Sequence, residues 1–322
     1  SKRSQEQHPR SLSQRASQAF GRRSSPSIIC VFLYAFLALL SVITICGNLL
    51  VIISVIYFKQ LHTPTNYLIL SLAVADLLVG IIAFPLSMAF SLSSCLYHEG
   101  LFCKVRGTFD ISLSTCSILN LCCISIDRYH AVCQPLTYQT KISPRVVVFM
   151  ILMSWGVSGI IGISVTIAGF NNEKCEESCL IDVLIESTVG PMLSFYLPVT
   201  MMLFIYLKIF FVALRQARRI QNTTKCGQTA SIMERKATKT LAIVLGVFIF
   251  CWSPFFLSIT FPPFTSDSVP VPVIETLNWL TLANSMLNPF IYAFFYSWFR
   301  SAIRMIICGK IFQGDFANTN MT

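Results

Sequence analysis

The sequence predicts an all-α membrane protein, a bundle of seven transmembrane helices followed by a short amphipathic helix on the cytoplasmic side. Of its 322 residues 54% are hydrophobic and only 12% are charged, and the mean hydropathy is +0.68. Soluble domains carry about 25% charged residues. Stretches with almost no charge recur seven times, each reaching the roughly 20 residues that cross a bilayer as a helix: 28–57, 66–90, 102–133, 146–168, 184–212, 238–262 and 272–296.

The segment before the first stretch, residues 1–27, is expected to be a disordered extracellular tail. It is rich in Ser, Gln and Arg and nearly lacks large apolar residues, which is typical of disorder. No short apolar region with a small-residue cleavage site precedes the first span, so we do not expect a secretory signal peptide. The predicted organisation is a tail at 1–27, a seven-transmembrane domain at 28–297, and an amphipathic helix with a cytoplasmic tail at 298–322.

Lys and Arg near the span ends predict the orientation, because cytoplasmic loops carry an excess of both residues. If the amino terminus is extracellular, the cytoplasmic segments hold Lys59, Lys141, Arg145, Arg215, Arg218, Arg219, Arg235, Lys236, Lys239, Arg300, Arg304 and Lys310. The outer segments are acidic, with Glu99, Glu173, Glu176, Glu177, Asp182, Glu186, Asp267 and Glu275 against Lys104, Arg106 and Lys174. The net charge of +10 is therefore expected to attract membrane lipid and an acidic intracellular partner, not nucleic acid.

Two aspartates mark the ends of the helical part of the third stretch, "DISLSTCSILNLCCISIDRY". The helix between Asp110 and Asp127 is about 25 Å long, so the two side chains lie near opposite faces of the membrane. Asp127 has the opposite charge of Arg128 beside it. Asp110 lies one to two turns below the outer surface, where an ionised side chain must be paired or face water.

Two interpretations of Asp110 are open. Arg106 precedes it by one helical turn and is placed for an i,i+4 ion pair. That order of charges is the weaker one on a helix, and a long Arg at a span end tends to reach outward to water. We therefore favour the second interpretation, in which Asp110 is the counter-ion of a bound cationic ligand.

Several polar residues fall at mid-membrane depth, where they must face the bundle interior and bond to one another or to water. They are Asn48, Asp76, Ser117, Asn284, Ser285 and Asn288. A structural hydrogen-bond network is expected, with or without a bound ion. Three prolines in the later spans, Pro198, Pro254 and Pro289, are expected to localise bends because each removes a helical hydrogen bond.

Most of the 13 cysteines lie inside the predicted spans, where Cys behaves as a small apolar residue. Cys103, together with Cys175 or Cys179 in the second outer loop, lies on the oxidising side of the membrane and is placed to form a disulfide. Cys308 follows the amphipathic stretch "SWFRSAIRMII" and is a candidate for palmitoylation. The alternative for Cys308 is an unmodified thiol at the interface.

Other functional classes lack the residues that they need. The seventh stretch has no Lys for a retinal Schiff base, and the 4 histidines all lie outside the span interiors with no HExxH motif. A hydrolase would need a nucleophile and base or metal ligands, and a transporter would show paired internal repeats. We therefore expect no enzyme and no cofactor, and no metal beyond the ion that the polar network at mid-membrane depth leaves open.

Motifs in all seven spans resemble those of the rhodopsin-like G-protein-coupled receptors. They are "GNLLV" with Asn48, "LSLAVADLL" with Asp76, Cys103 and "DRY", Trp155, "FYLP", "FCWSPFF" and "NPFIY". More narrowly, "NSMLNPFIYAFFYSWF" at Asn284–Phe299 is similar to the trace amine-associated receptor signature, and "YFKQLHTPTNYLI", "ERKATKTL" and "GKIFQ" resemble that family too. The resemblance covers residues 30–314. It implies a plasma-membrane receptor for trace, biogenic or odorant amines that signals through a stimulatory G protein to cyclic AMP.

The resemblance also implies roles for individual residues. The amine site would comprise Asp110, Ile111, Ser114, Ser194, Phe195, Trp252, Phe255, Phe256 and Trp279, although the aromatic residues fit plain packing equally well. G-protein coupling and activation would use Asp127, Arg128, Tyr129, Asn288, Pro289 and Tyr292. A sodium ion would be held by Asp76, Ser117, Asn284 and Asn288. Among the alternatives for the disulfide, the family pattern selects Cys103 with Cys179.

The chain departs from the family pattern at several positions. Leu96 replaces a Trp that usually follows the first-loop Cys, and Leu282 replaces the Tyr with which amine receptors face their aspartate. Some fish-type members carry a second acidic residue in span five, where this chain has Gly190. These departures predict a divergent, fish-type member of the family. Because Gly190 offers no second acid, we expect the ligands to be monoamines. A second ammonium could bind only if the side chain of Glu186 reached into the site. The alternatives are a neurotransmitter-type receptor for serotonin, dopamine or histamine, and an orphan or non-functional paralogue.

Overall fold

The computed structural model describes residues 28–92, 100–171, 192–220, 228–261 and 271–309. The chain divides into two compact units, Ser1–Leu39 and Leu40–Thr322. The described part of the first unit is the beginning of helix α2 (Ile28–Tyr57), where Val31, Phe32 and Phe36 are exposed. The second unit contains the rest of α2 and every other element discussed below.

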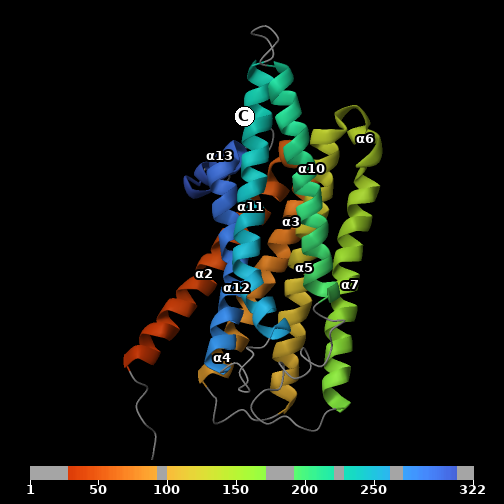
Figure 1. Ribbon diagram of the computed structural model, residues 1–322. Helices are drawn as coiled ribbons and strands as arrows, with labels where there is room; N and C mark the ends of the chain where they lie inside the picture. The colour runs from red at the N-terminus through yellow and green to blue at the C-terminus, as the bar shows by residue number, and fades with distance from the viewer. Residues whose placement is uncertain (1–27, 93–99, 172–191, 221–227, 262–270, 310–322) are drawn as a thin grey trace, which may run out of the picture. The chain divides into compact units, whose positions relative to one another are not determined.

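The described residues are helical and contain no strand, which confirms the predicted all-α class. The second span consists of α3 (Pro64–Leu78), a π-helical turn η2 (Val79–Ala83) and α4 (Phe84–Leu92). The third and fourth spans are α5 (Gly100–Cys133) and α7 (Pro144–Asn171), with the short α6 (Tyr138–Lys141) between them. The fifth, sixth and seventh are η4 (Met192–Tyr196) with α10 (Leu197–Ile220), α11 (Gln228–Thr260) and α12 (Val271–Phe295). Figure 1 shows α5 beside α7 and α10, and α11 beside α12.

Five helices are long and apolar enough to cross a membrane, within the part of the chain that the structure describes: Val31–Tyr57, Pro64–Ala89, Val105–Cys133, Pro144–Ser164 and Ser194–Val212. The sixth span has a shorter apolar stretch at Ile243–Ser258. The seventh is more polar because it carries Asn284, Ser285 and Asn288, and all three side chains are buried. Its polar groups therefore face protein, as a bilayer requires.

The helices of the fifth and sixth spans extend beyond the apolar stretches predicted at 184–212 and 238–262. Helix α10 runs on to Ile220, and α11 begins at Gln228. Arg218 and Arg219 therefore lie in α10, and Arg235, Lys236 and Lys239 lie in α11. Apolar periodicity predicts where a helix is buried in lipid, and it does not detect the polar turns that extend a helix beyond the membrane.

Two prolines follow π-helical turns. Turn η2 ends shortly before Pro85, and η4 ends shortly before Pro198. A proline lacks the backbone N–H and its ring crowds the carbonyl one turn earlier, so a wider turn before it relieves the contact. Neither π-helical turn was predicted, and the bend expected at Pro198 stays a prediction. Pro254 and Pro289 lie inside α11 and α12, which continue past them.

The main apolar core lies where α5, α10 and α11 meet. Ile118 and Leu121 of α5, Phe195 of η4, and Phe248 and Trp252 of α11 are all buried in it. Burial of such side chains contributes about 1.5–3 kcal/mol each in water. In a bilayer the lipid is as apolar as the core, so close van der Waals packing stabilises the association of the helices instead.

The amphipathic helix α13 (Ser297–Ile307) follows directly after the seventh span. Phe299 and Ala302 are buried, whereas Arg300 and Arg304 are exposed. After the helix, Gly309 adopts a positive φ of 66° and its N–H donates to the carbonyl of Ile306. This left-handed residue ends the helix, as glycine commonly does.

Candidate functional site

A cavity of about 50 Å³ lies among α5, η4, α11 and α12, with room for a few water molecules. Its lining includes the predicted residues Asp110, Ile111, Ser114, Ser194, Trp252, Phe255 and Phe256. Thr115, Ile118, Asn278 and Thr281 also line it and were not predicted. Helical spacing predicts Thr115 and Ile118, because residues 111, 114, 115 and 118 share one face of a helix.

Asp110 is the carboxylate of this cavity. Asp110 is 5% exposed, and neither of its carboxylate oxygens accepts a hydrogen bond of normal geometry from the described residues, although the side chains of Asn278 and Ser87 lie close to it. The Nε atom of Arg106 lies 3.5 Å from Oδ2 as an ion pair. A buried carboxylate with no donor is costly, so Asp110 has unused capacity for a cation that can donate hydrogen bonds.

Arg106 corrects one of our expectations. We expected its side chain to reach outward to water, but the residue is 5% exposed. Its Nη2 donates to both carboxylate oxygens of Glu275, at 2.8 and 3.1 Å, and its Nε donates to the hydroxyl of Ser87 at 3.2 Å. Glu275 was assigned to the acidic outer loops but lies within α12, with its side chain 21% exposed. The inward carboxylate of Glu275 explains why Arg106 stays inside.

The predicted aromatic residues divide into lining and supporting groups. Phe256 lines the cavity and stacks on Phe195 behind it, with ring centroids 4.1 Å apart and ring planes 5° apart. Phe195 itself is not a lining residue. Trp279 packs instead against Phe84, at 5.6 Å, in a cluster that includes Leu282. Leu282 thus fills a core position where an amine receptor would usually carry a tyrosine.

A polar network surrounds Asp76, which has no exposed surface. Its carboxylate accepts hydrogen bonds from Ser117 at 2.9 Å, Ser285 at 2.8 Å and Asn288 at 2.6 Å. Asn284 is buried nearby on α12, and its amide nitrogen finds no partner among the described residues. The three donors stabilise an ionised carboxylate at this depth.

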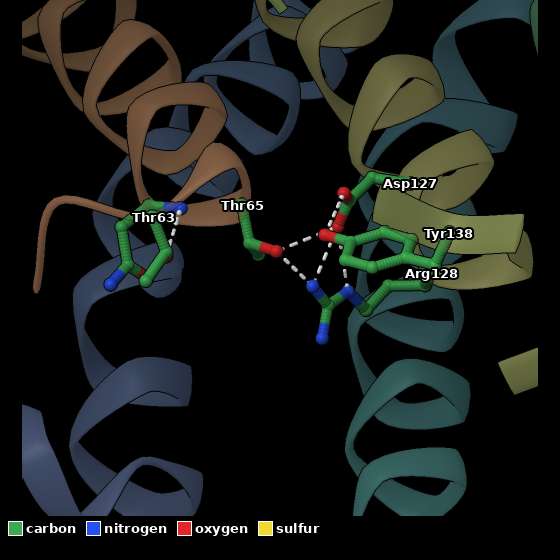
Figure 2. Close-up of polar contacts among 6 residues, drawn as sticks. Thr63, Thr65, Asp127, Arg128 and Tyr138 are labelled. Carbon is green, nitrogen blue, oxygen red and sulfur yellow. Dashed lines mark hydrogen bonds and ion pairs between the residues drawn. The ribbon is translucent and has the colours of Figure 1, made fainter. Parts of the chain in front are cut away.

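The opposite end of α5 carries a second cluster of polar contacts (Figure 2). Asp127 is fully buried and binds Nε and Nη2 of Arg128 at 2.9 and 2.6 Å. It also accepts hydrogen bonds from the hydroxyls of Thr65 and Tyr138, each at 2.8 Å. Nη2 of Arg128 contacts the Thr65 hydroxyl as well. Side chains from α3, α5 and α6 are therefore joined through one carboxylate.

The local structure positions this second cluster. The hydroxyl of Thr63 accepts a hydrogen bond from the backbone N–H of Asn66, and Pro64 is the first residue of α3, so the helix begins at a capped turn. Burial raises the pKa of the Tyr138 hydroxyl. Tyr138 therefore stays protonated and acts as a donor to Asp127. Tyr129, also predicted for coupling, packs edge-on against His130 instead.

The seventh span packs closely against the first at Pro289. A Cβ built on Gly47 would meet Cβ and Cγ of Pro289 at 3.0 Å, so the "GNLLV" motif needs its glycine for this approach. Asn48 donates to the carbonyls of Thr44 and Ser285 at 2.9 and 3.1 Å. Further along α12, Tyr292 is buried and packs edge-on against Phe299 at 6.3 Å.

Several predicted features lie outside the described residues. They are the partner cysteine Cys179, its alternative Cys175, and the positions Leu96, Glu186 and Gly190. Cys103 lies in α5, but its side chain is not described. The disulfide therefore stays a prediction. Cys308 is exposed directly after α13 with a free thiol.

Comparison with known proteins defines the class. Residues 47–292 match the family described as 7 transmembrane receptor (rhodopsin family), which is a class of receptors and not of enzymes. The chain is 43% identical to trace amine-associated receptor 1 of Macaca mulatta, over 88% of this chain and 89% of that relative. It is 42% identical to trace amine-associated receptor 2 of Homo sapiens, over 93% and 90%. It is 40% identical to trace amine-associated receptor 4 of Mus musculus, over 95% and 93%. The chain therefore belongs to the trace amine-associated receptors within the rhodopsin family.

Proposed function

We propose that this protein is a receptor for a protonated monoamine, which binds at Asp110 and signals through a stimulatory G protein to cyclic AMP. One observation carries the proposal. Asp110 is buried at a cavity with no hydrogen-bond donor on either carboxylate oxygen among the described residues. An ammonium group supplies the missing donors and an opposite charge, and such charge-assisted bonds are worth about 1.5–3 kcal/mol. The relatives are themselves named for trace amines.

The rest of the cavity suits the body of such a ligand. Trp252, Phe255 and Phe256 present aromatic surface to it, and Ile111 and Ile118 present aliphatic surface. An aromatic face attracts a cation by about 0.5–2 kcal/mol. The volume of about 50 Å³ favours small amines, because a larger body requires these side chains to move.

The second part of the proposal places the G protein at the Arg128 end of α5. Near this end Leu136 is 99% exposed in the short turn η3 (Pro135–Thr137), and Arg215 of α10 is exposed as well. An exposed apolar side chain among basic groups suits an amphipathic partner segment with acidic residues. Asp127 would restrain Arg128 at rest and release it when the receptor is activated.

The proposal includes an orientation and two smaller ligands. The amino terminus would be extracellular in the plasma membrane, with α13 on the inner leaflet and Cys308 as its palmitoylation site. A sodium ion would bind at Asp76, with Ser117, Asn284 and Asn288. The amide nitrogen of Asn284 has no described partner, so no hydrogen bond of this nitrogen is lost if the amide turns its oxygen toward such an ion.

A cyclic AMP assay across a panel of amines tests the proposal in cells that express the full chain. 2-Phenylethylamine, pentylamine and trimethylamine are suitable probes. Asp110→Asn is expected to lower potency at least about tenfold, because it removes the charge that the ammonium binds. Asp110→Glu keeps the charge and is expected to retain part of the response.

Surface staining shows whether each variant reaches the membrane. Cells without the stimulatory Gα subunit test the coupling, and they are expected to give no cyclic AMP response. If Asp110→Asn retains wild-type potency at normal surface expression, the amine site is elsewhere and the proposal is wrong.

A further inference from the structure

Three ionisable side chains form a chain of charges at the outer end of the cavity. Arg106 lies between the carboxylates of Asp110 and Glu275, and it also contacts Ser87. Asp110 and Arg106 are each 5% exposed. The group joins α4, α5 and α12.

The two carboxylates do not share Arg106 equally. Glu275 receives two short hydrogen bonds from Nη2, at 2.8 and 3.1 Å. The single Nε hydrogen of Arg106 goes to Ser87, so Asp110 is left with a 3.5 Å ion pair and no hydrogen bond from the described residues. The positive charge of Arg106 thus repels a ligand ammonium that approaches Asp110. Arg106 does not occupy the hydrogen-bonding positions on Asp110 that the ammonium would use.

The charge balance of the group bears on the ligand. Two carboxylates and one guanidinium leave a single negative charge in excess when all three are ionised. One ammonium at Asp110 would bring the group to neutrality, whereas a diamine would leave an uncompensated positive charge in a buried place, which is costly. Glu275 is the second acid that a diamine would need, and Arg106 already binds it.

We propose that Arg106 is a resident cation that sets both the affinity and the valence of the amine site: it competes with the ligand for Asp110 and keeps Glu275 from binding a second ammonium. This inference rests on the proposed function of Asp110. It makes Arg106 a specificity-determining residue, and its removal is expected to strengthen binding.

The test compares pentylamine with cadaverine, which share a five-carbon chain and differ by one ammonium. The full chain is purified in detergent, and the midpoint of thermal unfolding is followed as each amine is added, since a ligand that binds the folded state raises that midpoint. The variants are Arg106→Gln, Arg106→Lys, Glu275→Gln and the double variant Arg106→Gln/Glu275→Gln. Arg145→Gln, at an exposed position, is the matched control for the loss of one positive charge.

Arg106→Gln is expected to bind pentylamine about tenfold more tightly, because the competing charge is gone. In the same variant cadaverine is expected to gain about tenfold more than pentylamine does, because Glu275 becomes available. The double variant is expected to bind pentylamine as tightly as Arg106→Gln does. Its affinity for cadaverine is expected to rise no more than its affinity for pentylamine, because Glu275 is gone. Glu275→Gln alone is expected to weaken both amines, because Arg106 then turns to Asp110. Arg106→Lys and Arg145→Gln are expected to stay near the wild type.

The double variant also guards against misfolding, because it removes Arg106 together with Glu275 and leaves only Asp110 without its 3.5 Å ion pair. Weaker pentylamine binding in both Arg106→Gln and the double variant would show that Arg106 supports the site, and would overturn the inference while leaving the amine function intact. If no amine shifts the unfolding midpoint of the wild type or of any variant, the proposed function fails as well. Binding that appears only after Arg106 is replaced would support the inference directly.

Discussion

Tyr138 donates a hydrogen bond of 2.8 Å to Asp127 and so ties the short helix α6 to the end of α5. The same carboxylate binds Arg128. A side chain between the third and fourth spans therefore helps to orient the acid that binds the arginine proposed for G-protein coupling. Asp127 is thus held by a neighbour outside the predicted motif.

Replacement of Tyr138 by Phe tests this restraint. A hydrogen bond to a charged group contributes about 1.5–3 kcal/mol, so its loss is expected to raise basal cyclic AMP severalfold in the absence of amine. Tyr67→Phe is the matched control, because no hydrogen bond joins Tyr67 to Asp127 within the described part of the chain. Equal basal signalling in Tyr138→Phe and the wild type at equal surface expression would contradict the prediction.

Asp127→Asn removes the charge that binds Arg128. Basal signalling is expected to rise more than in Tyr138→Phe, because the ion pair and the hydrogen bonds weaken together. The double variant with Tyr138→Phe is expected to add little to Asp127→Asn alone, since both changes act on one carboxylate. Basal cyclic AMP, normalised to the amount of receptor at the cell surface, is measured for Asp127→Asn, Tyr138→Phe and the double variant. A silent, well-expressed Asp127→Asn would count against the restraint.

The packing of Gly47 on Pro289 predicts a cost for a single added methyl group. Gly47→Ala is expected to destabilise the receptor by about 1–3 kcal/mol, because its Cβ would meet a rigid proline ring. Gly246→Ala is the control, since a Cβ there meets nothing within 4 Å and a helical alanine is favourable by up to about 1 kcal/mol. Thermal unfolding in detergent compares the two variants. Equal unfolding midpoints would contradict the prediction and show that the helices can move apart enough to accept the methyl group beside Pro289.

The network at Asp76 predicts an effect of sodium. Replacement of sodium chloride by choline chloride is expected to change the potency of pentylamine in the wild type and not in Asp76→Asn, because the carboxylate is the charged ligand of the proposed ion. Ser117→Ala is expected to reduce the effect partially, since Ser117 is one of the donors to Asp76. An unchanged sodium response in Asp76→Asn would exclude this site.

Much of the architecture follows from composition and from the order of motifs, because a bilayer requires long apolar helices with inward polar groups. Asp110, Ser114 and Phe256 were predicted to share a site, and all three line the cavity. The position of Arg106 was mispredicted because its behaviour depends on Glu275, which is far away in the sequence. Asn278 and Thr281 were not predicted as lining residues for a similar reason, since only the packing of α12 against the other spans brings them to the site.

The π-helical turn η2 changes how the second span presents its side chains. An α-helix turns about 100° per residue, and a π turn accommodates one residue more, so α4 is rotated by about that angle relative to an unbroken continuation of α3. Ser87 lies after the turn, is fully buried and accepts the hydrogen bond from Arg106. A deletion of one residue within Val79–Ala83 would therefore convert the π turn into an ordinary α-helical turn and leave the same face of α4 directed toward the third span. Residues on the two sides of this turn belong to separate helical wheels, and sequence alignments of the second span should allow a gap there.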